Sequence, residues 1–131
     1  MNSNVRNIIF DASALIALAT KEKGYENIKP YLNKAMMSTV NVSEVLKRLV
    51  EGQDMTKDEC LFFLKVSSIL IQDFSFEQAL VAAEIRNTKK YGISFADRAC
   101  ISLAQMTGCS VLTCDRAWQE LDLDVKFIYP R

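Results

Sequence analysis

The sequence predicts an α/β fold, in which a central parallel β-sheet of four to five strands is flanked by helices. Short apolar runs alternate with longer segments of helical periodicity along the whole chain. No repeat, low-complexity tract or Pro/Gly-rich linker interrupts this alternation. Its 131 residues fit a single domain, 1–131, and a chain of this size buries roughly two-thirds of its unfolded surface.

Each predicted element follows from its local pattern. Strands are expected at residues 5–10, 36–40, 67–74, 109–114 and 125–129. Helices are expected at residues 13–22, 30–35, 42–52, 56–66, 75–92, 95–108 and 116–121. The helix at 42–52 has the clearest apolar face, and Gly92 and Gly108 mark the expected ends of two others. Strands that alternate with helices in this way indicate right-handed crossovers in a parallel sheet.

Composition excludes several classes of protein. Half of the residues are apolar and 24% are charged, which is typical of a soluble globular protein. No run approaches the roughly 20 apolar residues that span a bilayer, so no membrane partner is expected. Asp11 interrupts the apolar part of the N-terminal segment, which we therefore interpret as a strand and helix of a cytoplasmic protein rather than a signal peptide.

The chain contains no histidine. This removes the usual general base, the commonest zinc ligand and every nucleophile that depends on a histidine. The four cysteines have no C-x-x-C or zinc-site spacing, and Cys60 and Cys100 are expected to be buried free thiols. Catalysis at neutral pH would therefore depend on carboxylates, lysines or a metal-bound water.

Four acidic residues stand where predicted elements meet. Asp11 and Asp115 follow two strands, and Glu44 and Asp97 lie at the start of two helices. Ligands of open parallel sheets bind beyond the carboxyl ends of the strands, so all four carboxylates are candidates for the same sheet edge. Asp73 also follows the apolar part of a strand and Glu77 opens the next helix, and spacing alone does not exclude them.

Helix capping explains each acid equally well when it is taken singly. The sequences NVSE and SFAD match capping boxes, which pair Asn41 with Glu44 and Ser94 with Asp97. Asp11 and Asp115 could be simple N-caps. A third box, TKDE at 56–59, has no assigned chemistry.

The electrostatic cost of clustering distinguishes four separate helix caps from four carboxylates that share one site. At ~8 Å and an effective dielectric of 20, each like-charge pair costs about 2 kcal/mol. Six pairs would cost on the order of 10 kcal/mol, which is comparable to the stability of a whole domain. A true cluster therefore needs a cation or raised pKa values, and oxygen ligands favour Mg²⁺ or Mn²⁺. Such a site would let a metal-activated water attack a phosphodiester.

Other polar residues near the acids are candidates for accessory roles. The hydroxyls are Ser13, Ser43, Ser94 and Thr113. With a formal net charge of zero, nucleic-acid binding would need a local basic rim. Arg98 and Arg116 directly follow two of the acids, and Lys47 and Arg48 lie one turn beyond Glu44, so these four residues are the candidates for that rim.

The combination of four segments resembles the PIN-domain family, and most closely its VapC-type toxin ribonucleases of type II toxin–antitoxin systems. The segments are IIFDASALIAL, STVNVSEVL, GISFADRACISLA and VLTCDRAW, and together they span almost the whole chain. The family's acidic quartet falls on Asp11, Glu44, Asp97 and Asp115, and its accessory hydroxyls fall on Ser13 and Thr113. Asp73 and Glu77 match no motif position.

This resemblance implies a three-layer fold and Mg²⁺- or Mn²⁺-dependent endoribonuclease activity on structured RNA such as tRNA or ribosomal RNA. It also implies a homodimer and a cognate antitoxin that blocks the acidic groove. Helices between Val42 and Val66 would contribute to the dimer.

Two other functions stay open from the residues alone. A phospho-acceptor or phosphatase domain using Asp11 would need a second acid close by and a lysine after a late strand, whereas Ala-Ser-Ala follows Asp11 and Arg116 follows Asp115. A non-catalytic RNA- or protein-interaction module would be expected to lack at least one of the acids.

Overall fold

The computed structural model describes residues 5–130 and has a five-stranded sheet in the order β3-β2-β1-β4-β5. All four strand pairings are parallel. The strands are β1 (Ile8–Phe10), β2 (Ala35–Ser38), β3 (Leu70–Gln72), β4 (Ser110–Leu112) and β5 (Phe127–Ile128). The predicted parallel α/β sheet is therefore confirmed.

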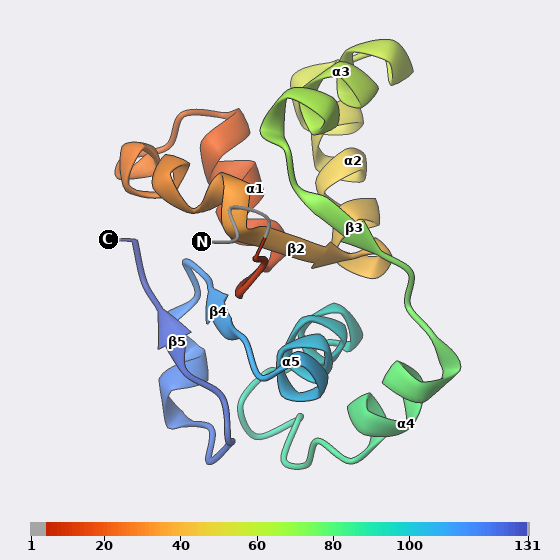
Figure 1. The fold of residues 1–131 in the computed structure, drawn as a ribbon, viewed down its shortest axis with the longest axis vertical. Coiled ribbons are helices and arrows are strands. Elements are labelled where there is room, and N and C mark those ends of the chain that lie inside the picture. The colour runs from red at the N-terminus through yellow and green to blue at the C-terminus, as the bar shows by residue number, and fades with distance from the viewer. Residues whose placement is uncertain (1–4, 131) are drawn as a thin grey trace.

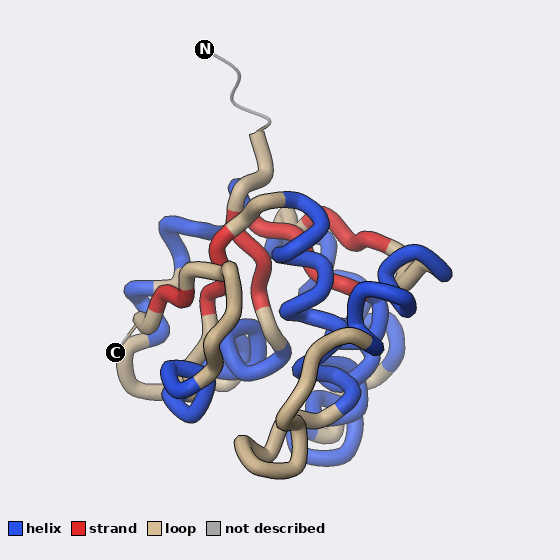
Figure 2. The backbone as a smooth tube through the Cα atoms, turned by 90° about the horizontal axis from the view of Figure 1, so that it is seen from below, coloured by secondary structure: helices blue, strands red, loops and turns tan. Residues whose placement is uncertain are grey.

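Helices cover both faces of this sheet. They are α1 (Ala12–Ala19), α2 (Thr39–Gln53), α3 (Lys57–Ser67), α4 (Phe76–Ala83) and α5 (Phe95–Thr107). Figure 1 shows α1, α2 and α3 on one side of the sheet and α4 and α5 on the other, which gives three layers. In Figure 2 the strands, in red, run between the helical segments, in blue.

β1 lies at the centre of the sheet and is buried on both faces. Ile8 and Phe10 pack into the core beneath α1 and α2, whereas Ile9 packs with Ile101 of α5 on the opposite side. Because successive strand residues point to opposite faces, a strand covered on both sides reads as one continuous apolar run. The predicted burial of the free thiols Cys60 and Cys100 is also confirmed.

The order of the strands reverses at β1. The chain runs from β1 outward to β2 and β3, and then returns to build β4 and β5 on the other side of β1. The loops after β1 and β4 diverge at such a switch point, which opens a crevice at the carboxyl edge of a parallel sheet. Asp11 and Asp115 follow these two strands.

Three helix predictions were wrong. Helix α4 ends at Ala83 instead of continuing to Gly92, because turns after it bury Ile85 and Ile93 in the core and Asn87 adopts a positive φ of 62°. Segments 25–27 and 29–34 form short 3-10 helices, and Pro30 lies in the first turn of the second, where a proline is tolerated. Residues 116–120 are also 3-10 rather than α-helical. No helix within residues 5–130 is long and apolar enough to cross a membrane.

Candidate active site

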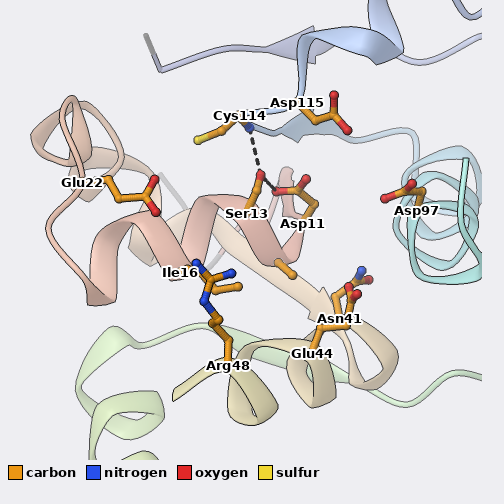
Figure 3. A pocket seen from close by; sticks show the side chains of 11 residues that line it. Asp11, Ser13, Ile16, Glu22, Asn41, Glu44, Arg48, Asp97, Cys114 and Asp115 are labelled. Carbon is orange, nitrogen blue, oxygen red and sulfur yellow. Dashed lines mark hydrogen bonds between the residues drawn. The ribbon is translucent and has the colours of Figure 1, made fainter. Parts of the chain in front are cut away.

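The four acids predicted from the sequence line one groove at the carboxyl edge of the sheet. This acidic groove has a volume of about 290 Å³, and Figure 3 shows the side chains around it. Its acids are Asp11, Glu22, Glu44, Asp97 and Asp115. They come from the end of β1, the turn after α1, helix α2, the start of α5 and the loop after β4. Distant segments of the chain therefore supply one site.

Asp11 is the most buried of these acids, with 5% of its surface exposed. Its Oδ1 accepts hydrogen bonds from the backbone N–H of Ala14, at 3.0 Å, and from the hydroxyl of Ser13, at 2.7 Å. Its Oδ2 accepts from the Thr113 hydroxyl at 2.6 Å. Asp11 thus caps helix α1 as predicted, and both accessory hydroxyls hold its carboxylate.

Ser13 and Thr113 also connect the loops that follow β1 and β4. The backbone N–H of Cys114 donates to Ser13 Oγ at 3.0 Å, and that of Asp115 donates to Thr113 Oγ1 at 2.9 Å. Each hydroxyl therefore binds the Asp11 carboxylate and a backbone N–H of the loop after β4. This network fixes the backbone of Asp115 relative to Asp11 across the switch point.

Capping interactions hold two further acids. Asp97 Oδ2 accepts from the N–H of Ser94 at 2.9 Å, and Ser94 Oγ accepts from the N–H of Asp97 at 3.1 Å, so the predicted capping box is confirmed. Asp115 Oδ1 accepts from the N–H of Ala117 at 3.0 Å. Capping and groove lining are therefore properties of the same side chains.

The predicted capping box of Asn41 and Glu44 was wrong. Helix α2 begins at Thr39, with Ser38 as its N-cap, so Asn41 and Glu44 lie inside the helix. The side chain of Glu44 faces the groove from α2, and Asn41 is completely buried one turn before it. The sequence therefore identified Glu44 as a site residue from its place near a helix start, whereas the capping role predicted for Asn41 was wrong.

Burial and mutual repulsion raise the pKa values of Asp11, Glu44 and Asp97. Burial is the main cause for Asp11, whose pKa is about 6 instead of 3.8; hydrogen bonds from Thr113, Ser13 and Ala14 oppose the rise, and the charge of Asp97 adds to it. Burial and the charge of Asp97 raise the pKa of Glu44. Burial also raises the pKa of Asp97, with a contribution from Asp115. The carboxylates therefore act on one another, as the cluster hypothesis requires.

The carboxylate oxygens of the groove are suitable ligands for a divalent cation, although their side chains are not arranged in a complete coordination site. In the described part of the chain, no group of three or more His, Cys, Asp or Glu residues is arranged to hold a metal ion. The groove instead presents carboxylate oxygens, which Mg²⁺ and Mn²⁺ prefer. A cation would stabilise the charged forms of Asp11, Glu44 and Asp97, whose pKa values are raised by burial first and by repulsion second.

Several other candidates lie outside the groove. The guanidinium of Arg98 reaches the carbonyl of Ala82 at 3.3 Å, and that of Arg116 lies over the ring of Tyr129. Ser94 acts as a cap and does not line the groove. Asp73 and Glu77, which spacing left open, are exposed and also lie elsewhere.

Sequence reasoning missed two groove residues, Glu22 and Asn41. Glu22 reaches the groove because the chain turns back after α1, where Lys21 has a positive φ of 54° and the N–H of Glu22 bonds to the carbonyl of Ala17. No spacing rule marks that turn. Of the four basic residues predicted to form a rim, Arg48 lines the groove, and it lies on the same helix as Glu44.

A model of the PIN domain family matches residues 8–123. The chain belongs to the PIN domain family. Its fold resembles that of a toxin–antitoxin complex from Klebsiella pneumoniae, with a TM-score of 0.70 and 17% identity over 95% of this chain and 98% of the other. The comparison with curated proteins gives no significant match.

Two further solved structures share this PIN fold. DNA-bound VapBC from Salmonella typhimurium has a TM-score of 0.69 and 14% identity, covering 97% of this chain and 100% of the other. A sarcin-ricin-loop-cleaving toxin from Mycobacterium tuberculosis has a TM-score of 0.64 and 13% identity, covering 91% and 98%. At these identities the likeness shows the fold alone.

Proposed function

We propose that this PIN domain is a metal-dependent endoribonuclease that acts as the toxin of a toxin–antitoxin pair. The observation that carries the proposal is the convergence of Asp11, Glu44, Asp97 and Asp115 in one groove, where burial and mutual repulsion raise the pKa values of three of them. Similar folds include a toxin that cleaves an RNA loop and toxins in complex with antitoxins, which supports the same function here.

The acids are proposed to hold Mg²⁺ or Mn²⁺ near an RNA phosphodiester. The bound cation would activate water for attack on phosphorus and neutralise charge on the leaving oxygen. Asp11 is held for this task by Ser13 and Thr113, and Asp97 by Ser94. Water attack needs no histidine, in keeping with a chain that has none.

Arg48 is proposed to bind the RNA backbone beside these acids. Its side chain lines the acidic groove and also the adjoining surface between α1 and α2. A guanidinium presents several donors to phosphate oxygens in a fixed plane. This local cation would support RNA binding in a chain whose formal net charge is zero.

Exposed apolar side chains support two protein partners, a cognate antitoxin and a second copy of the chain. One patch lies on α3 and includes Phe62 and Val66, which are 66% and 58% exposed. The other lies on α4 and α5 and includes Phe76 and Phe95, which are 80% and 52% exposed. Such patches commonly mark interaction sites. We propose that these surfaces bind the antitoxin and the second copy in the cytoplasm.

RNA cleavage tests this function directly. Purified, antitoxin-free protein is incubated with total cellular RNA in Mn²⁺ or in EDTA, alongside Asp97→Asn and the control Asp73→Asn, which neutralises an exposed acid outside the groove. We expect discrete fragments from the wild type and from Asp73→Asn in Mn²⁺ only. Cleavage that persists in EDTA or in Asp97→Asn, or intact RNA with folded wild-type protein, would contradict the proposal.

A further inference from the structure

Asn41 is a completely buried polar side chain that lines the acidic groove and bonds from α2 to α5. It lies on α2, one turn before Glu44, and it lines the groove. Its Nδ2 donates to the backbone carbonyl of Ala96 at 3.0 Å. Ala96 directly precedes Asp97 in the first turn of α5. One side-chain amide therefore joins the helix that carries Glu44 to the residue beside Asp97.

The same amide also acts on Glu44. Burial and the charge of Asp97 raise the pKa of Glu44, and the side chain of Asn41 lowers it. Figure 3 shows the ends of the two side chains together, below Asp97 and Asp11. Asn41 thus lies beside Glu44 of its own helix and is bonded to the helix that carries Asp97.

This arrangement leaves one polar atom unsatisfied. Asn41 Oδ1 is buried and has no hydrogen-bond partner. A buried acceptor without a partner destabilises the folded state, whereas an apolar side chain of similar shape would fill the same space without that cost. Native proteins rarely keep such groups, and those that persist call for a specific explanation. Packing alone does not explain an asparagine here.

We infer that Asn41 is a positioning residue, which sets Glu44 on α2 against Asp97 on α5 so that both carboxylates face the same divalent cation. The inference rests on the proposed metal-dependent function and assigns to it a residue beyond the four acids. Residues that orient metal ligands commonly change metal affinity or activity by roughly 10- to 100-fold when they are replaced.

Gln78 provides a matched control in the same molecule. It is 1% exposed, lies on α4, and donates its Nε2 to the backbone carbonyl of Ala99 on α5 at 2.7 Å. The two side chains therefore make the same kind of amide-to-carbonyl bond to the same helix, at similar burial. Only Asn41 lines the acidic groove. Replacing each by leucine separates positioning from packing.

The test is a calorimetric titration of Mn²⁺ alone into metal-free wild type, Asn41→Leu and Gln78→Leu, with thermal unfolding measured for each. We expect Asn41→Leu to weaken Mn²⁺ binding by roughly 10- to 100-fold. Gln78→Leu should bind Mn²⁺ like the wild type, whatever change in melting temperature either variant shows. Asn41→Ser, with a smaller side chain, serves as the second variant if leucine does not fit.

Each other outcome would overturn the inference. Wild-type affinity in Asn41→Leu would leave the proposed function intact and remove the role of Asn41. Equal weakening in Gln78→Leu, or loss of folding in both Asn41 variants, would make Asn41 a packing residue. Failure of the folded wild type to bind Mn²⁺ would overturn the proposed function together with the inference.

Discussion

Asp11 caps helix α1 and lines the acidic groove at the same time. Its carboxylate accepts three hydrogen bonds, yet its pKa is still raised to about 6, since burial outweighs them. Burial of an uncompensated charge lowers the stability of the folded state, and a site that binds a cation must tolerate this before the cation arrives. The capping and catalytic interpretations of this residue are therefore compatible.

Asp11→Asn should stabilise the metal-free protein at neutral pH. The pKa of Asp11 rises from 3.8 in the unfolded chain to about 6 in the folded protein. The folded state therefore binds more protons between these values, and stability falls as pH rises from about 4 to 6. The shift corresponds to about 3 kcal/mol at pH 7. We expect the variant to gain about 1–3 kcal/mol there and nothing at pH 3, because one hydroxyl must turn to accept from the amide.

Urea unfolding in EDTA at a series of pH values measures this difference. The wild type and Asp11→Asn should differ in unfolding free energy by an amount that grows from pH 4 to 6 and is then constant. A difference that shrinks over this range would mean that the pKa of Asp11 is lowered, and the argument that burying its charge destabilises the folded state would be wrong.

Local signals decided which elements the sequence could predict. The Ser94–Asp97 box was readable because a capping box is a pattern of four consecutive residues. The start of α2 could not be predicted in this way, because Ser38 and Asn41 are both favourable N-cap residues. The choice of Ser38 depends on where β2 ends, and β2 pairs with β3 as far as Ser38. Rotation of a helix about its axis is not written in local sequence either, so Arg98 pointed to the groove in prediction but faces α4 in the structure.

The chain offers two capping boxes with different surroundings. Ser94 caps α5 beside the acidic groove, and Thr56 caps α3 on an exposed surface. Replacing either by alanine should cost about 1 kcal/mol of stability, because each removes an acceptor for a helix N–H. Only Ser94→Ala also releases the group that orients Asp97. We therefore expect similar losses of stability, measured by urea unfolding, and a several-fold loss of Mn²⁺-dependent RNA cleavage in Ser94→Ala alone.

Two results would count against this view of α5. Equal cleavage by Ser94→Ala and the wild type would show that capping does not orient Asp97. Lower cleavage by Thr56→Ala, after correction for the unfolded fraction, would show that general stability limits the activity.

On the scale of the whole molecule, the sequence was sufficient for the layers and for the place of the four acids. Alternating strands and helices imply a parallel sheet, and the carboxyl ends of parallel strands share one edge, so Asp11 and Asp115 had to lie on the same side. The order of the strands could not be predicted from the sequence, and the crevice between β1 and β4 depends on that order. Glu22 and Asn41 escaped prediction because a turn and a helix interior carry them into the groove.

The central claim is that acids from distant segments act as one metal site. Groups that act as a unit lose most of their function when any one of them is removed, so combined substitutions are not additive. The rate of Mn²⁺-dependent RNA cleavage is therefore compared among wild type, Asp11→Asn, Asp97→Asn and the double variant. We expect each single change to lower the rate by roughly 100-fold or more, the upper end for groups that support a metal, and the double variant to be little worse than either. Independent losses that multiply in the double variant would contradict a single shared site.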